Sequence, residues 1–554
     1  MSGRRPPLTT DRRLGPGAVL RHGASAPYRA VEIIAGEPHL VRDDLGAPDP
    51  AARPQAGRPL LTLVQVTDLQ LADVQSPTRF EFLNRYFADP RYAEIVPVQR
   101  PQEALNAHAI DATLRTINAV RGPVTGAVPQ LAVTTGDAID NAQWNEMQAF
   151  LALFDGGVVR PGSGGHGYVG VQSPDWPDDF FWKPDGCGVH GEDLFRREFG
   201  FSHHPGLLER AMEEFSASGL RLPWLSCFGN HEALNQGVGR ITTGVAAALT
   251  GNQKPLRLPE DFDHDRALHM FTERPEAFMA GPSVTITADP GRRPITRREF
   301  VEAHFRPGAR PFGHGFTEQN RLDGTAYYAH DTPAARLIAL DTSCVAGGAA
   351  GSLDPDQARW LEARLAEAHS SYRGPDGNEV RTGNDDMLVV VFSHHGVDTL
   401  GNTRARRDGR DGEAPLGAAE VVALLHRFPN VVLWLNGHTH LNAVRPRPDP
   451  DHPGRGFWEV TTCAIVDWPC QARIIEIIDS GGCLSVVCTM VDHDSPAAPR
   501  SLQTVDDLAA LHREIAANMP VIGADSGRAG TPGDRNAELR MTPPFPLGRV
   551  TGWR

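Results

Sequence analysis

The stretch LLTLVQVTDLQ, residues 60–70, joins an apolar strand pattern to two polar side chains. Residues 60–66 are mostly Leu and Val, which is typical of a strand that is covered on both faces of a sheet. The apolar run stops at Asp68, and Gln70 follows two residues later, on the same side of an extended chain. Because Asp is also a common turn residue, this stretch alone predicts a buried strand that ends in a polar loop.

The same pattern returns along the chain, with short apolar runs that end in polar clusters. Five further segments have it: 130–137 (QLAVTTGD), 222–231 (LPWLSCFGNH), 337–343 (LIALDTS), 387–395 (MLVVVFSHH) and 431–440 (VVLWLNGHTH). Helical patterns lie between several of them, with apolar residues at 110, 114 and 117 and again at 358, 361 and 365. Strands that alternate with helices predict an α/β fold.

The remaining segments suggest one large domain with extensions. Residues 1–58 read as an N-terminal extension rich in Pro, Arg and Gly, and residues 491–554 as a C-terminal helix, near 504–518, followed by a tail. Residues 59–490 would form the domain itself and end in three β-like runs, 458–469, 471–479 and 484–492. Two long interruptions, about 155–205 and 236–325, are expected to be lids or small subdomains.

Composition restricts the classes of protein and partner. The chain of 554 residues has 54 Lys and Arg against 68 Asp and Glu, a net charge of −14, with no basic run, which does not favour nucleic-acid or anionic-membrane binding. Its seven cysteines form no C-x-x-C pair, which argues against a disulfide framework and a Cys-rich zinc site. No stretch has the length and apolarity of a membrane span or signal peptide, so a cytoplasmic location without membrane attachment is expected.

The polar clusters at the strand ends predict a metal site. Each cluster comes where an apolar run stops, and the carboxyl ends of strands in an α/β sheet are where ligands bind. Carboxylate, amide and imidazole groups together suit Mn, Fe, Zn or Mg, and the clusters contain no thiolate. The polar residues of these clusters in chain order are Asp68, Gln70, Asp137, Asp140, Asn230, His231, Glu232, His394, His395, His438 and His440. The two histidines of GHTH are two residues apart, so both rings would point to one side if that stretch is extended.

In this order, the motifs D-x-Q, GD-x-x-D, GNHE, HH and GH-x-H resemble those of the calcineurin-like metallophosphoesterase superfamily. The resemblance covers residues 59 to about 490 and points to a bacterial branch of unassigned substrate, with Gln70 where most relatives have His. It implies a four-layer α/β/β/α sandwich, in which two mixed β-sheets are flanked by helices. It also implies two divalent metal ions bridged by Asp137, one held by Asp68, Gln70 and His440 and the other by Asn230, His394 and His438.

The resemblance also assigns roles in catalysis. His231 would protonate the leaving oxygen or steady charge on the phosphate, and Asp140 would orient His231. Glu232 is expected to support its loop, and His395 either to contact phosphate or to act from behind the site. Gln70 offers a neutral oxygen in place of imidazole, which should weaken its metal site or favour Mn and Mg.

The function that follows is hydrolysis of a phosphodiester or phosphomonoester by water activated at the two metal ions, with a small-molecule phosphate ester as substrate. Two alternatives remain, a nuclease of the same superfamily and a metal-bound scaffold that has lost catalytic power. The acidic net charge argues against the nuclease. The presence of His231 and Asp140 argues against the scaffold, because a structural metal site needs neither. For Trp468 and Arg79, core packing and a surface ion pair are expected in preference to roles in the pocket.

Overall fold

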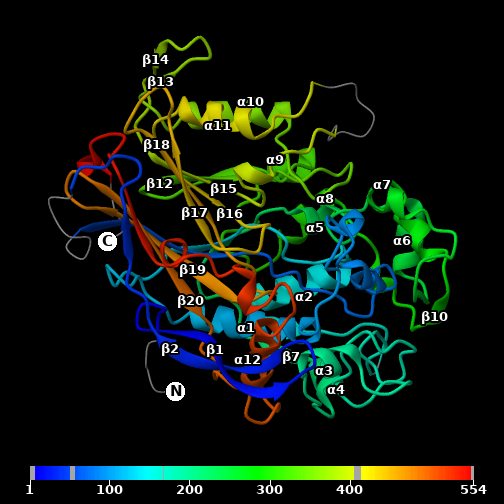
Figure 1. The fold of residues 1–554 in the computed structure, drawn as a ribbon. Helices are drawn as coiled ribbons and strands as arrows, with labels where there is room; N and C mark the ends of the chain where they lie inside the picture. Colours follow the sequence, from blue (N-terminus) through cyan, green and yellow to red (C-terminus); the bar gives the residue numbers. More distant parts are fainter. Residues whose placement is uncertain (1–5, 50–56, 166, 405–412, 551–554) are drawn as a thin grey trace.

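Two mixed β-sheets lie at the centre of this computed structural model, which describes residues 6–49, 57–165, 167–404 and 413–550 (Figure 1). The seven-stranded sheet has the order β3 (Leu40–Arg42), β21 (Ala537–Met541), β20 (Leu484–Asp492), β19 (Gln471–Asp479), β4 (Arg58–Val66), β5 (Leu131–Thr134) and β8 (Trp224–Leu225). The six-stranded sheet has the order β11 (Tyr328–Asp331), β12 (Ala335–Leu340), β15 (Leu388–Ser393), β16 (Val431–Asn436), β18 (Gly456–Thr461) and β17 (Ala443–Pro448).

Parallel strands at the centre of each sheet bring the polar strand ends together. β4, β5 and β8 run parallel in the first sheet, and β12, β15, β16 and β18 run parallel in the second. These are the strands predicted from the apolar runs. Because parallel strands end at the same edge, the residues that follow β4, β5, β8, β15 and β16 meet at one end of the two sheets.

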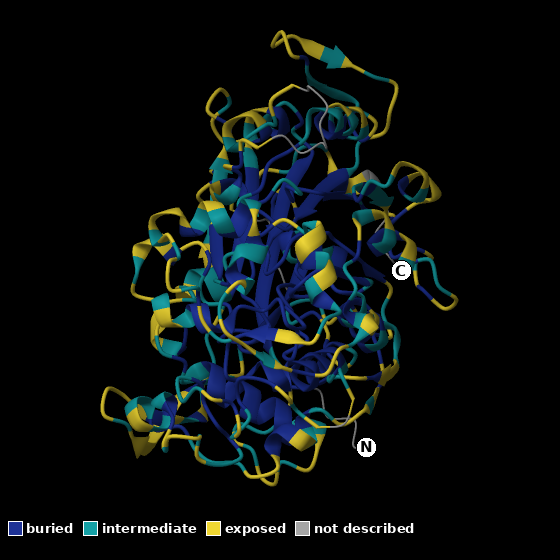
Figure 2. Ribbon diagram, turned by 90° about the vertical axis from the view of Figure 1, so that its right-hand side faces the viewer, coloured by how far each residue is buried: buried dark blue, intermediate teal, exposed yellow. Residues whose placement is uncertain are grey.

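Apolar side chains from the facing sides of the two sheets form the main hydrophobic core. Leu63 and Val133 of the first sheet and Val390 and Leu433 of the second belong to this one buried cluster, and all four are fully buried. Figure 2 shows the central strands as a continuous buried interior, with the exposed residues on outer helices, loops and peripheral strands. Since both faces of these strands are covered, their sequences are apolar throughout rather than alternating.

Helices cover the outer face of each sheet and complete four layers (Figure 1). α10 (Pro355–Ala366) and α11 (Ala418–His426) pack on the six-stranded sheet, where Leu361 and Leu425 join a second core cluster. α1 (Asn106–Ile117), α2 (Trp144–Asp155) and α12 (Val505–Ala517) lie on the side of the seven-stranded sheet. The predicted α/β class with two mixed sheets flanked by helices is therefore confirmed, as are the helices predicted in the segments now seen as α1, α10 and α12.

Both terminal segments contribute to the seven-stranded sheet. β3 pairs in parallel with β21, which pairs antiparallel with β20, so segments almost 500 positions apart in sequence are neighbours. β1 (Arg12–His22) and β2 (Pro27–Ala35) form a separate hairpin that lies on α12, where Tyr28 donates a hydrogen bond to Glu514. α13 (Pro532–Arg535) precedes β21. The predicted domain boundaries remain predictions.

The two long interruptions fold into small subdomains packed on the core. The first contains β6 (Gly157–Val159) and α3 (Leu194–Phe199), and is followed by α4 (Leu207–Ala211) and β7 (Phe215–Ala217). Trp182 anchors it, because its buried ring packs in one cluster with Leu511 of α12. The second contains α6 (Thr243–Leu249), β9 (Gln253–Pro255), α7 (Ala267–Glu273), β10 (Ser283–Thr285), α8 (Arg297–Ala303) and α9 (Glu318–Asp323).

The remaining elements are short. A hairpin of β13 (Ser371–Arg373) and β14 (Glu379–Arg381) projects beyond α10 and α11 (Figure 1). Single 3-10 turns occur at Glu81–Tyr86, Pro90–Tyr92, Glu103–Leu105, His264–Arg266, Pro275–Met279, Pro290–Arg292, Val397–Thr399, Ala524–Ser526 and Leu547–Arg549. Within the parts of the chain that the structure describes, every helix is too short or too polar to cross a bilayer.

Candidate metal centre

The structure brings all nine predicted site residues to one end of the two sheets. Those that line a common cavity of about 180 Å³ are Gln70, Asp137, Asp140, Asn230, His231, His438 and His440. Asp68 and His394 are fully buried and lie directly behind this lining. The residues come from the ends of β4, β5, β15 and β16 and from α5 (Asn230–Ala233), which follows β8.

Asp137 lies at the centre of the group. Its Oδ2 atom is 3.0 Å from Nε2 of His394 and 3.8 Å from Nε2 of His231. Asp68, Asp137 and His394 each offer a donor atom within 4.8 Å of the others, and so do His394, His395 and His438. His440 extends the group on the other side, with Nε2 at 3.3 Å from Oδ1 of Asp68. A carboxylate in this central place can be shared by two cations.

Two amide oxygens show that the site suits hard cations. Oε1 of Gln70 and Oδ1 of Asn230 are buried, and neither has a hydrogen-bond partner among the residues that the structure describes. The amide nitrogen of Asn230 donates to the carbonyl of Gly237 at 2.9 Å, which leaves its oxygen turned away from that bond. A buried polar atom without a partner costs on the order of 1–3 kcal/mol, and coordination of a cation would remove that cost. Seven oxygen and imidazole donors therefore fit two divalent ions.

The imidazole ligands are oriented from behind by acceptors. Nδ1 of His394 contacts the carbonyl of Thr135 at 2.8 Å, and Nδ1 of His440 contacts Oδ2 of Asp467 at 2.6 Å. A ring that donates from Nδ1 presents its Nε2 lone pair to the site, which is the arrangement found around metal-bound histidines. Although burial raises the pKa of the Asp68 carboxyl, the imidazoles of His440 and His394 outweigh it and lower that pKa.

The backbone at the site is in an unusual conformation. Five of the seven predicted ligands have positive φ angles: Asp68 (48°), Gln70 (40°), Asp137 (53°), His438 (68°) and His440 (57°). Non-glycine residues rarely adopt this left-handed conformation, and such strain concentrates at functional sites. The condition that GHTH is extended is therefore not met: both histidines reach the site from a tight turn, because the chain reverses after β16.

His231 is held mainly by the backbone of its predicted partner. Its Nδ1 atom contacts the carbonyl oxygen of Asp140 at 2.7 Å, while the nearer Asp140 carboxylate oxygen lies 3.4 Å away. Nε2 faces Gln70, whose amide nitrogen is 3.1 Å away. Burial lowers the pKa of His231, but the carboxylates of Asp137 and Asp140 outweigh it and raise the pKa to about 9. A ring fixed at Nδ1 can hold a proton at Nε2, on the side of the cavity.

Arg79 is part of a buried ion-pair network, so the prediction of a surface pair is wrong. Its side chain is 1% exposed, and its guanidinium pairs with Asp140 at 3.0 Å and with Glu103 at 2.8 Å. The network fixes the Asp140 carboxylate below His231. Arg79 lies only 11 positions after Asp68, so the sequence indicates that it is near the site. Its burial could not be predicted, because no sequence pattern distinguishes a buried arginine from an exposed one.

Three other residues take supporting roles. Glu232 accepts hydrogen bonds from four backbone amides, those of Asp137, Ala138, Ile139 and Gly229, and so holds its loop as expected. Both ring nitrogens of His395 are engaged, with Thr342 Oγ1 and the carbonyl of Ala349, each at 2.8 Å, which places His395 behind the site. Trp468 is buried among apolar neighbours, as predicted.

Sequence reasoning missed three charged residues at the site. Asp467 is fully buried and accepts from His440 at 2.6 Å and from Nε of Arg100, also at 2.6 Å. Arg100 and Arg528 both line the cavity. Asp467 could have been found from the sequence, because it follows the apolar pair Ile465 and Val466 just as Asp68 follows the apolar run of residues 60–66. Arg528 lies in the predicted tail, where no periodicity connects it to the site.

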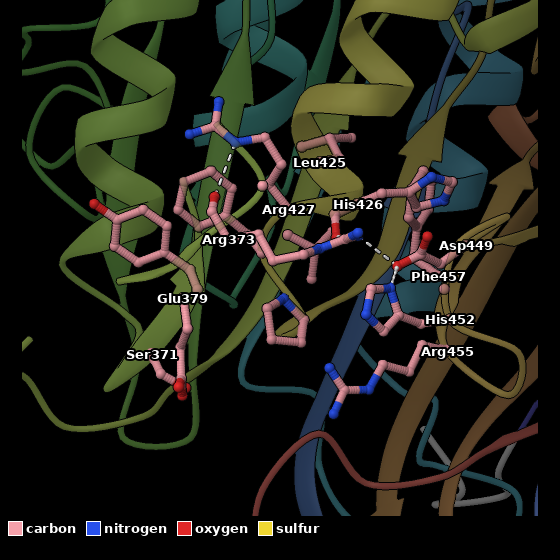
Figure 3. Close-up of a pocket in the computed structure, with 16 residues that line it drawn as sticks. Ser371, Arg373, Glu379, Leu425, His426, Arg427, Asp449, His452, Arg455 and Phe457 are labelled. Atoms are coloured by element: carbon pink, nitrogen blue, oxygen red, sulfur yellow. Dashed lines mark hydrogen bonds and ion pairs between the residues drawn. The ribbon is translucent and has the colours of Figure 1, made fainter. Parts of the chain in front are cut away.

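A second cavity, of about 310 Å³, lies between the β13–β14 hairpin, the end of α11 and the loop between β17 and β18 (Figure 3). Its charged groups are largely paired with one another: Arg373 contacts Asp449 at 2.6 Å, and His452 contacts the same carboxylate at 3.3 Å. This cavity contains none of the predicted site residues. This cavity is larger than the one at the predicted site, but its charged groups are already paired with one another, so its volume alone does not make it the functional site.

Comparison with known proteins gives limited matches. No protein-family model matches the sequence. The glycerophosphodiester phosphodiesterase GpdQ of Enterobacter lignolyticus (strain SCF1) is 34% identical over 113 residues, which are 20% of this chain and 33% of that protein. The chain thus matches about a third of the length of this curated relative.

Two solved structures are also similar. A dimetal phosphatase from Danio rerio aligns with a TM-score of 0.33 and 11% identity over 79% of this chain and 100% of the other. GAP50, the anchor in the inner membrane complex of Plasmodium, aligns with a TM-score of 0.24 and 10% identity, over 79% of this chain and 85% of the other.

The fold and the order of the site residues agree with the resemblance drawn from the sequence. Two mixed sheets are flanked by helices, and carboxylate, amide and imidazole donors lie at the strand ends in the order described above. The chain thus resembles the calcineurin-like metallophosphoesterase superfamily, and the match to GpdQ over 113 residues supports that resemblance.

Proposed function

We propose that this protein hydrolyses a phosphate ester of a small molecule with the help of two divalent metal ions. The observation that carries the proposal is the convergence of Asp137 and six further oxygen and imidazole donors, two of which are buried amide oxygens without a partner among the described residues. One ion would be held by Asp68, Gln70 and His440, and the other by Asn230, His394 and His438. Asp137 would bind both ions. When bound, such ions polarise the phosphate and lower the pKa of water.

The chain's own residues would carry the proton chemistry. His231 is fixed at Nδ1 by the carbonyl of Asp140 and turns Nε2 toward Asp137 in the cavity. A protonated Nε2 at this place can donate to the leaving oxygen as the ester bond breaks. Asp140 and Arg79 hold the ring in that orientation through the buried ion pair. The donors are fixed before substrate arrives, which favours charge stabilisation in the transition state.

The proposal is tested by phosphate release from two chromogenic substrates. The purified protein, loaded with Mn, Zn, Fe or Mg, would be assayed with bis-p-nitrophenyl phosphate and p-nitrophenyl phosphate. We expect turnover of at least one ester with at least one ion, together with two equivalents of metal per chain by elemental analysis. The name of the curated relative leads us to expect the diester to be the better substrate.

The negative outcomes separate the alternatives. Two bound metals without turnover of any ester, in a wider library of phosphorylated metabolites, would favour the scaffold. Cleavage of single-stranded or double-stranded DNA or RNA at rates above those for small esters would favour the nuclease. No metal binding at all would contradict the proposal itself.

A further inference from the structure

Two arginines, Arg100 and Arg528, line the cavity. Arg528 makes longer contacts with its neighbours than Arg100 does. Arg528 is supplied by residues 527–531, which follow the turn Ala524–Ser526 and precede α13. Its guanidinium makes two contacts with the described residues, both from Nη1: the carbonyl of Thr439 at 3.4 Å and Oδ2 of Asp467 at 3.5 Å. Both distances are at the outer limit of a hydrogen bond.

Its apparent partner, Asp467, is already occupied. Oδ1 of Asp467 accepts from Nε of Arg100 at 2.6 Å, and Oδ2 accepts from His440 at 2.6 Å. Arg100 is 7% exposed and also faces Glu103 at 3.7 Å, so its charge is balanced by two carboxylates. Both oxygens of Asp467 are thus engaged by closer groups, and Arg528 reaches this carboxylate only at 3.5 Å.

The side chain of Arg528 is nonetheless partly removed from water. It is 22% exposed and lines the cavity with His440 and Thr439. Burial lowers the pKa of Arg528, which reports the cost of taking the charged form out of solvent. Guanidinium has five N–H donors, and of the three nitrogens only Nη1 contacts a described residue. The remaining donors are open to the cavity, where water or an anionic oxygen can accept from them.

The backbone around Arg528 is firmly docked, so the Cα end of the side chain is fixed at the edge of the cavity. The carbonyl of Arg528 accepts from the amide of Asn442 at 2.9 Å, and Gly530 packs so closely that an added Cβ would lie 2.4 Å from the Asn442 carbonyl. Arg535 secures the following residues by pairing with Glu37 at 2.7 Å. The 527–531 segment is therefore a fixed wall of the cavity.

We propose that Arg528 binds an anionic oxygen of the phosphate ester and so selects substrates with unesterified phosphate oxygens near the metal centre. The inference rests on the proposed function, because it assumes that phosphate occupies this cavity. Thr439 lies between the ligands His438 and His440, so an anion held by the free donors of Arg528 would be adjacent to the metals. Charge-assisted hydrogen bonds from arginine to phosphate are strong and geometrically specific.

The test compares phosphate binding with turnover. Calorimetric titration of the Mn-loaded protein with inorganic phosphate should give a Kd about tenfold to a hundredfold weaker in Arg528→Ala than in the wild type. Arg528→Lys should fall between them, because it keeps the charge but not the planar fork. For p-nitrophenyl phosphate, KM should rise by a similar factor while kcat changes less than about threefold.

Arg455→Ala is the matched control. Arg455 lines the second cavity and is exposed, so its loss removes the same charge without touching the metal centre (Figure 3). Metal content by elemental analysis must remain at the wild-type level in every variant, since a role that is merely structural would lower it. If Arg528→Ala does not fold, Arg528→Gln, which keeps most of the side chain, replaces it.

The outcomes separate this inference from the proposed function. A phosphate Kd in Arg528→Ala or Arg528→Gln within twofold of the wild-type value would overturn the inference, and so would a weakening that follows loss of metal. Phosphate binding that depends on Arg528, in a protein that turns over no ester, would support the inference and contradict catalysis. Turnover that is insensitive to Arg528 would contradict the inference alone.

Discussion

Nδ1 of His440 lies 2.6 Å from the carboxylate of Asp467, a residue that is not among the predicted ligands. Asp467 comes from the segment between β18 and β19, and so ties the end of the six-stranded sheet to the beginning of an antiparallel strand of the other sheet. The carboxylate fixes which nitrogen of His440 carries the proton and therefore which one can bind metal.

Asp467→Asn should weaken metal binding. The amide cannot take the negative charge that orients His440, and loss of such a supporting carboxylate typically costs 10- to 100-fold in metal affinity. We expect one of two metal equivalents to dissociate at a lower chelator concentration, measured by elemental analysis after dialysis. Asp449→Asn is the control, because Asp449 also pairs with an arginine and a histidine, in the second cavity. Equal metal retention in both variants would contradict the prediction.

His231→Ala should separate catalysis from metal binding. Removal of a general acid is expected to reduce kcat by roughly 100-fold or more, while both metals stay bound, because none of the proposed ligands is changed. The measurement is steady-state hydrolysis of the better chromogenic ester, with metal content determined on the same sample. His452→Ala, at a partly exposed position of the second cavity, should retain wild-type activity. Full activity of His231→Ala on several esters would remove the proposed role.

Gln70→His should change metal preference. Histidine tolerates the left-handed backbone at this position, where φ is 40°. Imidazole is softer than an amide oxygen, so the affinity for Zn should rise relative to that for Mn and Mg, by about tenfold or more. Competition titration with a chromogenic chelator measures this ratio. Gln319→His, on the exposed side of α9, should leave it unchanged. An unchanged ratio in Gln70→His would show that this side chain is not a ligand.

Glu514 should make folding stability depend on pH. Burial raises the pKa of its carboxyl from an ordinary value of 4.5 to about 7, an effect only partly offset by the hydrogen bond from Tyr28. Because the folded-state pKa is the higher one, the neutral acid favours folding below about pH 4.5, and this contribution is lost as pH rises to about 7. The loss is roughly 3 kcal/mol at most.

Glu514→Gln removes this titration. The free energy of unfolding of Glu514→Gln minus that of the wild type should therefore be larger at pH 8 than at pH 5. Urea unfolding at both pH values measures this difference. Glu260→Gln, at a side chain that is 94% exposed, should show no such change. Parallel pH profiles for wild type and Glu514→Gln would contradict the assignment.

Sequence patterns were sufficient for the central strands and for the polar side chains that gather at their ends. A strand buried on both faces needs an uninterrupted apolar run, and the carboxyl end of a parallel strand is where a ligand residue can face a cavity. Leu63 and Asp68 follow from these rules without knowledge of the rest of the fold. The same rules failed at the GHTH turn, because φ angles above zero depend on how the chain reverses, which is decided by its tertiary neighbours.

Residues that act through long-range contacts were not predictable. Arg528 lies 88 positions after His440 and reaches the cavity through a loop without regular structure. Arg79 has no apolar periodicity to mark it as buried. The short strands β3 and β21 have three and five residues, too few for an alternation to be distinguished from a loop.

The pairing of β21 with β3 and β20 has a consequence for synthesis of the protein on the ribosome. Until residues 537–541 have emerged, β20 presents an unpaired edge of nine residues, and residues 40–42 have no partner strand. Such an open edge can capture another nascent chain. A polypeptide stopped near residue 500 would also lack α12 and Arg528, so premature termination should yield aggregation-prone material.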